Sequence, residues 1–173
     1  MAKTVFSYIL LFVVLVAAQA VVFNQICLFG VAVPLVFIFF ILRLPVNTGP
    51  NTLLTLGFIL GLTVDVFSDT PGMNALCCTV LAGLRNPILH LYLPREDNIS
   101  NPIPSMKSLT GSVYLKYVIT AITLYCALYF ILESFTFFAL RMLILRIAAS
   151  TLLTFIIIIC IDSLTSLKSE KRL

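Results

Sequence analysis

The stretch that decides the fold is Gly57–Leu76, GFILGLTVDVFSDTPGMNAL. It places a carboxylate, Asp65, at the end of an apolar run, with Gly61 and Gly57 four and eight residues before it. Residues four apart lie on the same face of a helix, so these three residues form one stripe. Glycines let a neighbouring backbone approach closely, and such packing associates helices in lipid. We therefore expect another helix to cover the stripe and Asp65 to point into protein, because a charge at the bilayer centre costs about 3 kcal/mol.

The composition is that of a membrane protein. The 173 residues are 61% hydrophobic and only 10% charged, with a mean hydropathy of +1.13, whereas soluble domains carry about 25% charged residues. Each crossing of the bilayer needs about 20 apolar residues, so most of the chain is expected to lie within lipid. The first apolar run has no small-residue cleavage site followed by a soluble chain, so we interpret it as a retained span.

The hydropathy pattern predicts an all-α integral membrane protein with six transmembrane helices in a single domain, residues 1–173. Residues 93–113 form the one long predicted loop, and residues 163–173 form a short tail. Pro34 lies inside the second predicted helix and is expected to kink it, because proline lacks a backbone donor. The six predicted spans are residues 5–23, 28–44, 52–68, 73–92, 114–133 and 138–162.

Asp65 needs a partner if it is buried, and depth in the membrane identifies a candidate. Arg146 enters the sixth predicted helix near the outer face, at the level of Asp65, whereas Arg85 lies toward the opposite end of the fourth. We therefore predict an interhelical ion pair between Asp65 and Arg146 that fixes the bundle. The alternative interpretation, a proton or ligand site, remains open.

The sequence offers little else that could carry chemistry. The five cysteines are scattered through apolar runs without a pair at metal-ligand spacing, and His90 is the sole histidine. These patterns support neither a disulfide framework nor a zinc site, and there is no phosphate-binding glycine loop. We expect no catalysis and no cofactor. The net charge of +4 gathers on one predicted side, which indicates membrane topology and not nucleic-acid binding.

The opening stretch resembles the signature of the MreD family of bacterial rod-shape-determining membrane proteins. In that family a helix carries Gly-x3-Gly-x3-Asp, followed by a Gly-x-x-Ala-Leu turn into the next helix. Many members have a His where this chain has Asn74, so no role of that His is carried over. The residues that match the pattern are Gly57, Gly61, Asp65, Gly72, Ala75 and Leu76.

The resemblance implies a non-enzymatic subunit of the cell-elongation machinery, which supports rod shape and lateral peptidoglycan synthesis. The implied direct partner is MreC, with MreB, the RodA glycosyltransferase and its transpeptidase partner in the same complex. The implied fold is similar to the six-helix substrate-binding subunits of energy-coupling-factor vitamin transporters. Size and span count also leave open that the chain is itself such a vitamin-capturing subunit, although its predicted outer loops are short and mostly apolar.

The charge distribution predicts that both termini and residues 93–113 are cytoplasmic. With six spans, one side carries eight cations and the loops of the other side carry Arg141 alone, and the positive-inside rule assigns the basic side to the cytoplasm. Reporter fusions after Asn24, Pro71 and Ser134 should therefore report the outer side. A cytoplasmic signal at any of these sites would contradict the six-span topology. The eight cations are Lys3, Arg43, Arg95, Lys107, Lys116, Lys168, Lys171 and Arg172.

Overall fold

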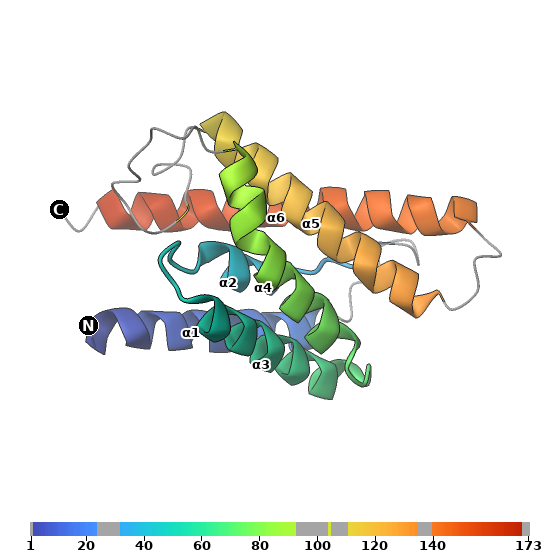
Figure 1. The fold of residues 1–173 in the computed structure, drawn as a ribbon, viewed down its shortest axis with the longest axis horizontal. Helices are drawn as coiled ribbons and strands as arrows, with labels where there is room; N and C mark the ends of the chain where they lie inside the picture. Colours follow the sequence, from blue (N-terminus) through green and yellow to red (C-terminus); the bar gives the residue numbers. More distant parts are fainter. Residues whose placement is uncertain (1, 24–31, 93–103, 105–110, 135–139, 171–173) are drawn as a thin grey trace.

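The protein is a bundle of helices of very different lengths (Figure 1). The computed structural model describes residues 2–23, 32–92, 104, 111–134 and 140–170, without the side chains of 2–5 and 164–170. Apart from one isolated bridge residue, every regular element in these ranges is helical. The elements are α1 (Ala2–Ala18), the π-helix η1 (Gln19–Phe23), α2 (Ile38–Arg43), α3 (Pro50–Ser68), α4 (Met73–Tyr92), α5 (Gly111–Glu133) and α6 (Leu140–Glu170).

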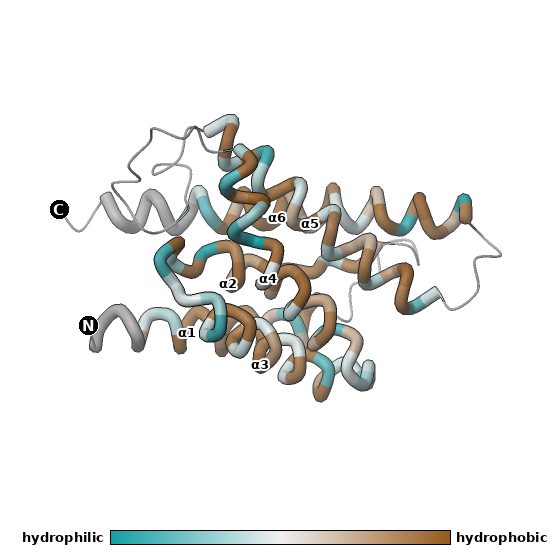
Figure 2. Tube along the Cα trace, viewed as in Figure 1, coloured by the Kyte–Doolittle hydropathy of each residue, from teal (hydrophilic) through white to brown (hydrophobic). Residues whose placement is uncertain are grey.

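Four helical segments in the described residues are long and apolar enough to cross a membrane, fewer than the six predicted spans. They are Phe6–Phe23, Pro50–Ser68, Gly111–Glu133 and Leu140–Ser163. The fourth predicted span does form a helix, α4, but polar residues interrupt its apolar sequence, as the hydrophilic colouring along it shows (Figure 2). The chain is thus an all-helical membrane protein in its described part, and the six-span count is not confirmed.

The second predicted span, residues 28–44, is not a continuous helix. Residues 28–31 lie outside the described part; residues 32–37 are not helical, and α2 that follows has only six residues. Pro34 lies within the non-helical segment, so the predicted kink is in fact an interruption. Phe37, Ile38 and Ile41 are each 0% exposed, which means that this apolar run is the protein core and not a lipid-facing span.

Side chains of η1 and α6 form hydrogen bonds with backbone groups of the non-helical segment. Gln19 of η1 donates from Nε2 to the Pro34 carbonyl at 3.0 Å and accepts from the Val36 amide at 3.1 Å. On α6, Thr154 Oγ1 accepts from the Leu35 amide, also at 3.0 Å. Irregular backbone at membrane depth needs partners within the protein, because lipid offers none. These side chains explain how a non-helical segment is tolerated here.

The helices form a series of packed neighbours. The most extensive contact is between α3 and α4; α4 then packs on α5, and α5 on α6. α1 begins and α6 ends at the same end of the molecule, marked N and C, and α2 lies between these two helices in the same view (Figure 1). The structure also differs from the predicted tail at residues 163–173, because α6 continues to Glu170. No proline or glycine interrupts the helix there. Most of the predicted 93–113 loop lies outside the described residues.

The hydrogen bond from the Leu35 amide to Thr154 should contribute measurably to stability. Thr154→Val keeps the shape of the side chain but leaves a buried N–H unsatisfied, which typically costs about 1–3 kcal/mol. The matched control is Thr123→Val, because the Thr123 hydroxyl bonds only to the Ile119 carbonyl of its own helix and is exposed. Reversible unfolding in mixed detergent should show a loss for Thr154→Val and little change for Thr123→Val. Equal stability of the two variants would contradict this role.

Candidate functional site

The stretch Gly57–Leu76 forms a tight helical hairpin of α3 and α4. α3 ends at Ser68, and Asp69 follows in the left-handed conformation with φ 53°. The Asp69 amide donates to the Asp65 carbonyl, which closes the last turn of α3. Gly72 takes φ 81°, a conformation that glycine adopts without strain. The motif glycine at this position therefore serves the turn, and the two helices become antiparallel neighbours.

The Asp65 carboxylate caps the first turn of α4 across this hairpin. Its Oδ2 accepts from the Ala75 amide at 2.9 Å, and its Oδ1 accepts from the Asn74 amide at 3.0 Å. Oδ1 also accepts from the Thr70 hydroxyl at 2.8 Å and from Asn74 Nδ2 at 3.0 Å. The first amides of a helix have no partner within the helix and carry its positive dipole end, so a carboxylate is well placed there. Asp65 is only 5% exposed, and backbone and polar donors satisfy both its oxygens.

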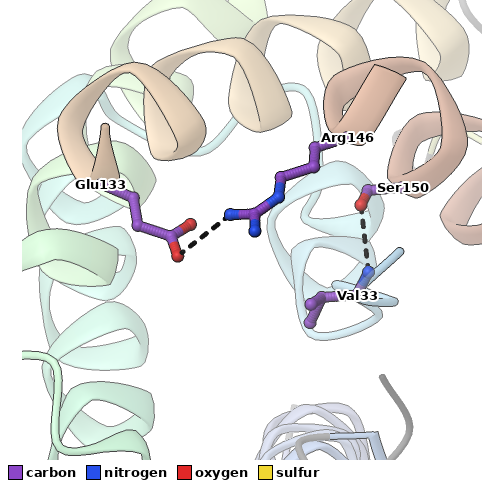
Figure 3. Close-up of polar contacts among 4 residues, drawn as sticks. All are labelled: Val33, Glu133, Arg146 and Ser150. Atoms are coloured by element: carbon purple, nitrogen blue, oxygen red, sulfur yellow. Dashed lines mark hydrogen bonds and ion pairs between the residues drawn. The ribbon is translucent and has the colours of Figure 1, made fainter. Parts of the chain in front are cut away.

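The predicted ion pair between Asp65 and Arg146 is not formed. Arg146 Nη1 lies 3.8 Å from Glu133 Oε1, and both side chains are more than 40% exposed. Figure 3 shows Arg146 directed at Glu133, while Ser150, one turn further along α6, accepts from the Val33 amide at 3.0 Å. The prediction was wrong because depth alone selected the partner. The turn residues nearest Asp65 offer neutral donors that satisfy its carboxylate without a second buried charge.

Both motif glycines face α4, so the stripe is covered by the next helix along the chain. A Cβ added at Gly57 would lie 2.9 Å from both the Ala82 Cβ and the Cys78 carbonyl oxygen. At Gly61 it would lie 2.6 Å from the Ala75 nitrogen and would overlap the Ala75 Cα and the Asn74 carbonyl. The closest approach of the two backbones is therefore at Gly61, one turn before Asp65. This approach brings the carboxylate within reach of the α4 amides.

Asn74 links the hairpin to α5, a role that our sequence reasoning missed. Its side-chain amide donates to Asp65 and to Thr70 Oγ1, the latter at 3.1 Å. Its Oδ1 accepts from the Tyr125 hydroxyl at 2.7 Å. Tyr125 also packs edge to face on Phe37, with ring centroids 5.8 Å apart. The signal available in the sequence was a polar residue in the first turn of a helix beside a buried acid.

The motif residue Leu76 does not belong to the buried part of the hairpin, because its side chain is 49% exposed.

Arg85 is another buried charged residue of the described core, and sequence reasoning set it aside. It is 0% exposed and lies on α4. Its guanidinium donates from Nη2 to the Leu44 carbonyl, from Nη1 to the Pro45 carbonyl at 3.4 Å, and from Nε to the Tyr117 hydroxyl at 3.2 Å. Leu44 is the extended C-cap residue directly after α2, so Arg85 binds carbonyls just beyond the C-terminus of this short helix. The proline after α2 could have indicated these free carbonyls.

A cavity of about 300 Å³ lies beside the turn of the hairpin. Its walls come from η1, the non-helical segment, the end of α3, the turn after it, the first turn of α4 and α5. The lining side chains on which its chemistry depends are Gln19, Leu35, Phe37, Asp69, Asn74 and Tyr129. Non-helical backbone within a membrane protein is expected where it is buried or lines such a cavity.

Comparisons of the chain with models of known families, with curated proteins and with solved structures found no match.

Replacing Asp65 should destabilise the fold even when size is preserved. Asp65→Asn turns one acceptor oxygen into a donor that faces an N–H, so at least one of its hydrogen bonds is lost. Hydrogen bonds to charged groups contribute about 1.5–3 kcal/mol, and we expect a loss of that order in the free energy of unfolding. Arg146→Gln is the control, because a half-exposed pair contributes about 0–1 kcal/mol. A larger loss of unfolding free energy for Arg146→Gln than for Asp65→Asn would contradict this account and support the predicted ion pair.

The three glycines inside α3 and α4, Gly57, Gly61 and Gly83, should rank by the space at each position. Gly61→Ala forces the added carbon into the backbone of α4 and should be the most destabilising, and Gly57→Ala should be intermediate. Gly83→Ala is the control, since its Cβ would meet only the Leu54 side chain at 3.5 Å, and alanine favours a helix over glycine by about 1 kcal/mol. The thermal unfolding midpoints of the three variants, measured in detergent, give the order of their stabilities. Equal stability of Gly61→Ala and Gly83→Ala would show that the helices are not in close contact.

Proposed function

We propose that this protein is a non-enzymatic membrane adaptor of the bacterial cell-elongation complex, of the MreD type. It supports rod shape and lateral peptidoglycan synthesis by binding MreC directly. MreB, RodA and the transpeptidase partner of RodA belong to the same complex. On this proposal the chain lies in the bacterial inner membrane with both termini in the cytoplasm, as the distribution of Lys and Arg predicts.

The main support for the proposal is that the motif residues Gly57, Gly61, Asp65, Gly72 and Ala75 together form the α3–α4 hairpin. Gly57 and Gly61 admit α4, Gly72 forms the turn, and Asp65 caps α4 at Ala75. This role accounts for the spacing of the MreD-like signature without any reaction. A rigid hairpin is what an adaptor needs in order to present a fixed surface to its partner.

The hydrogen bonding and burial of the Asp65 carboxylate support a non-enzymatic role. A general base or nucleophile must reach a substrate with a free lone pair. The Asp65 oxygens accept from Thr70, Asn74 and Ala75 and are buried. Removing the carboxylate from these donors for catalysis would uncap α4. Asp65 therefore fits a structural role better than an acid–base role.

A second candidate function is kept because of the cavity beside the hairpin. A substrate-capturing subunit of an energy-coupling-factor vitamin transporter needs polar and aromatic residues around a pocket. Asp69, Asn74 and Tyr129 line the 300 Å³ cavity, although the adjoining loops are short in the sequence. The two functions are distinguished by purification from native membranes. A tightly bound vitamin in the purified protein would favour the transporter, and co-purification with MreC would favour the adaptor.

Leu76 offers a specific test of the adaptor proposal. It belongs to the motif but is exposed, so its side chain is available to a partner and not to the described core. Leu76→Ala should reduce co-purification of MreC and disturb rod shape while the protein level in membranes stays normal. Leu84→Ala is the matched control, because Leu84 is a 41% exposed leucine of α4 outside the motif.

Equal co-purification of MreC with both leucine variants and the unmodified chain would show that Leu76 is not a contact. If the unmodified chain itself recovers no MreC from membranes in which both proteins are present, the adaptor proposal fails.

A further inference from the structure

The cavity beside the hairpin is bounded by the two most unusual backbone segments of the described chain. Gln19 comes from the π-helix η1, and Val33, Leu35 and Phe37 come from the non-helical segment. Single-turn π-helices occur frequently at functional sites, and interrupted helices in membrane proteins commonly surround binding sites. A helix in place of either segment would present a more regular surface here. Both features therefore point to a ligand at the same place.

The size of the cavity fits a small molecule. At about 300 Å³, it is at the lower end of the range of roughly 300–1,000 Å³ found for small-ligand sites. Its wall is partly apolar, with Leu35, Val64 and Phe67 among the lining residues, and partly polar. This combination suits a compact solute with one polar or charged group.

Two polar side chains of the wall are already engaged within the protein. Gln19 holds the non-helical segment at Pro34 and Val36, and Asn74 bonds with Asp65, Thr70 and Tyr125. These amides shape the cavity and have little remaining capacity to bind a ligand. They also fix the position of the wall, which is what a preformed site requires.

Asp69 and Tyr129, unlike Gln19 and Asn74, have polar side-chain groups that are not engaged by other described residues. Neither the Asp69 carboxylate nor the Tyr129 hydroxyl makes a hydrogen bond or ion pair with the residues that the structure describes, and both residues line the cavity. No lysine, arginine or histidine is among the lining residues. Asp69 is exposed and Tyr129 is partly buried, so the described lining residues offer a solvent-accessible carboxylate and a hydroxyl but no cation.

The aromatic residues of the wall complement this charge. Phe37, Phe67 and Tyr129 all line the cavity, and Tyr129 stacks on Tyr125 at 6.4 Å between ring centroids. Aromatic faces attract ammonium groups, and recognition of substituted ammonium compounds depends on such rings. A carboxylate and aromatic rings that line one pocket together favour a cation over an anion or a neutral solute of the same shape.

We propose that this cavity is a binding site for a small organic ammonium compound, whose charge lies against Asp69 and the rings of Phe37, Phe67 and Tyr129. The site does not depend on the adaptor function and is compatible with either function discussed above. It can be tested on the purified chain alone, so its failure would leave the MreC experiment unaffected.

The test uses choline and n-butylammonium as probes, each titrated into the full-length protein in detergent at constant ionic strength. The uncharged isostere of choline, 3,3-dimethyl-1-butanol, shows how much binding depends on charge. Choline, n-butylammonium or both should bind saturably in calorimetry. A cation that binds should do so at least about tenfold more tightly than the uncharged isostere, as expected for a charge-assisted contact. Absence of saturable binding by both cations, or equal affinity for the isostere, would overturn the proposal.

Two variants identify the residue responsible. Asp69→Asn removes the charge and is compatible with the left-handed conformation, which asparagine tolerates. It should weaken binding of the cation at least about tenfold without changing the thermal unfolding midpoint. Glu133→Gln is the matched control, because Glu133 is an acid of the same helix as Tyr129 that does not line the cavity. Unchanged affinity in Asp69→Asn, or an equal loss in Glu133→Gln, would refute the assignment.

Discussion

The fold depends on the contact between the Asp65 carboxylate and the first amides of α4. This contact requires close approach of two backbones, which Gly61 permits, and a turn that reverses the chain within a few residues, which Asp69 and Gly72 provide. Asn74 then extends the contact to Tyr125 on α5. A change at Gly61, Asp65 or Asn74 is therefore transmitted to α3, α4 and α5 together.

Two of the three buried charged residues in the described core, Asp65 and Arg85, follow the same rule. Asp65 binds the first amides of α4, and Arg85 binds backbone carbonyls just after the C-terminus of α2. An ion pair between them would have placed two long side chains in one geometry, and a buried pair often gains little after desolvation. Helix termini supply fixed, preoriented partners instead. In this way α4 is held at both ends, by its own first turn and by its arginine.

The amino-acid sequence predicted the membrane character, the helical class and the close-packed face of Gly57 and Gly61. It did not predict the partner of Asp65, because the capping amides belong to the backbone and are not visible as a residue type. It also misassigned residues 28–44. An unbroken apolar run has the same composition whether it faces lipid or fills a core, and only the polar groups on other helices, Gln19 and Thr154, distinguish the two. The cavity was not foreseen, since its wall combines elements that lie far apart in the sequence, from η1 to α5.

The account is tested most directly by hydrogen exchange at the Asn74 and Ala75 amides of the purified protein, measured with and without the Asp65→Ala substitution. If the carboxylate caps α4, these two amides exchange slowly in the unmodified chain and substantially faster in the variant. The amides around Arg85, near the other end of the same helix, should exchange at similar rates in both proteins. Unchanged protection of Asn74 and Ala75 after loss of the carboxylate would contradict the central claim that Asp65 holds the hairpin together.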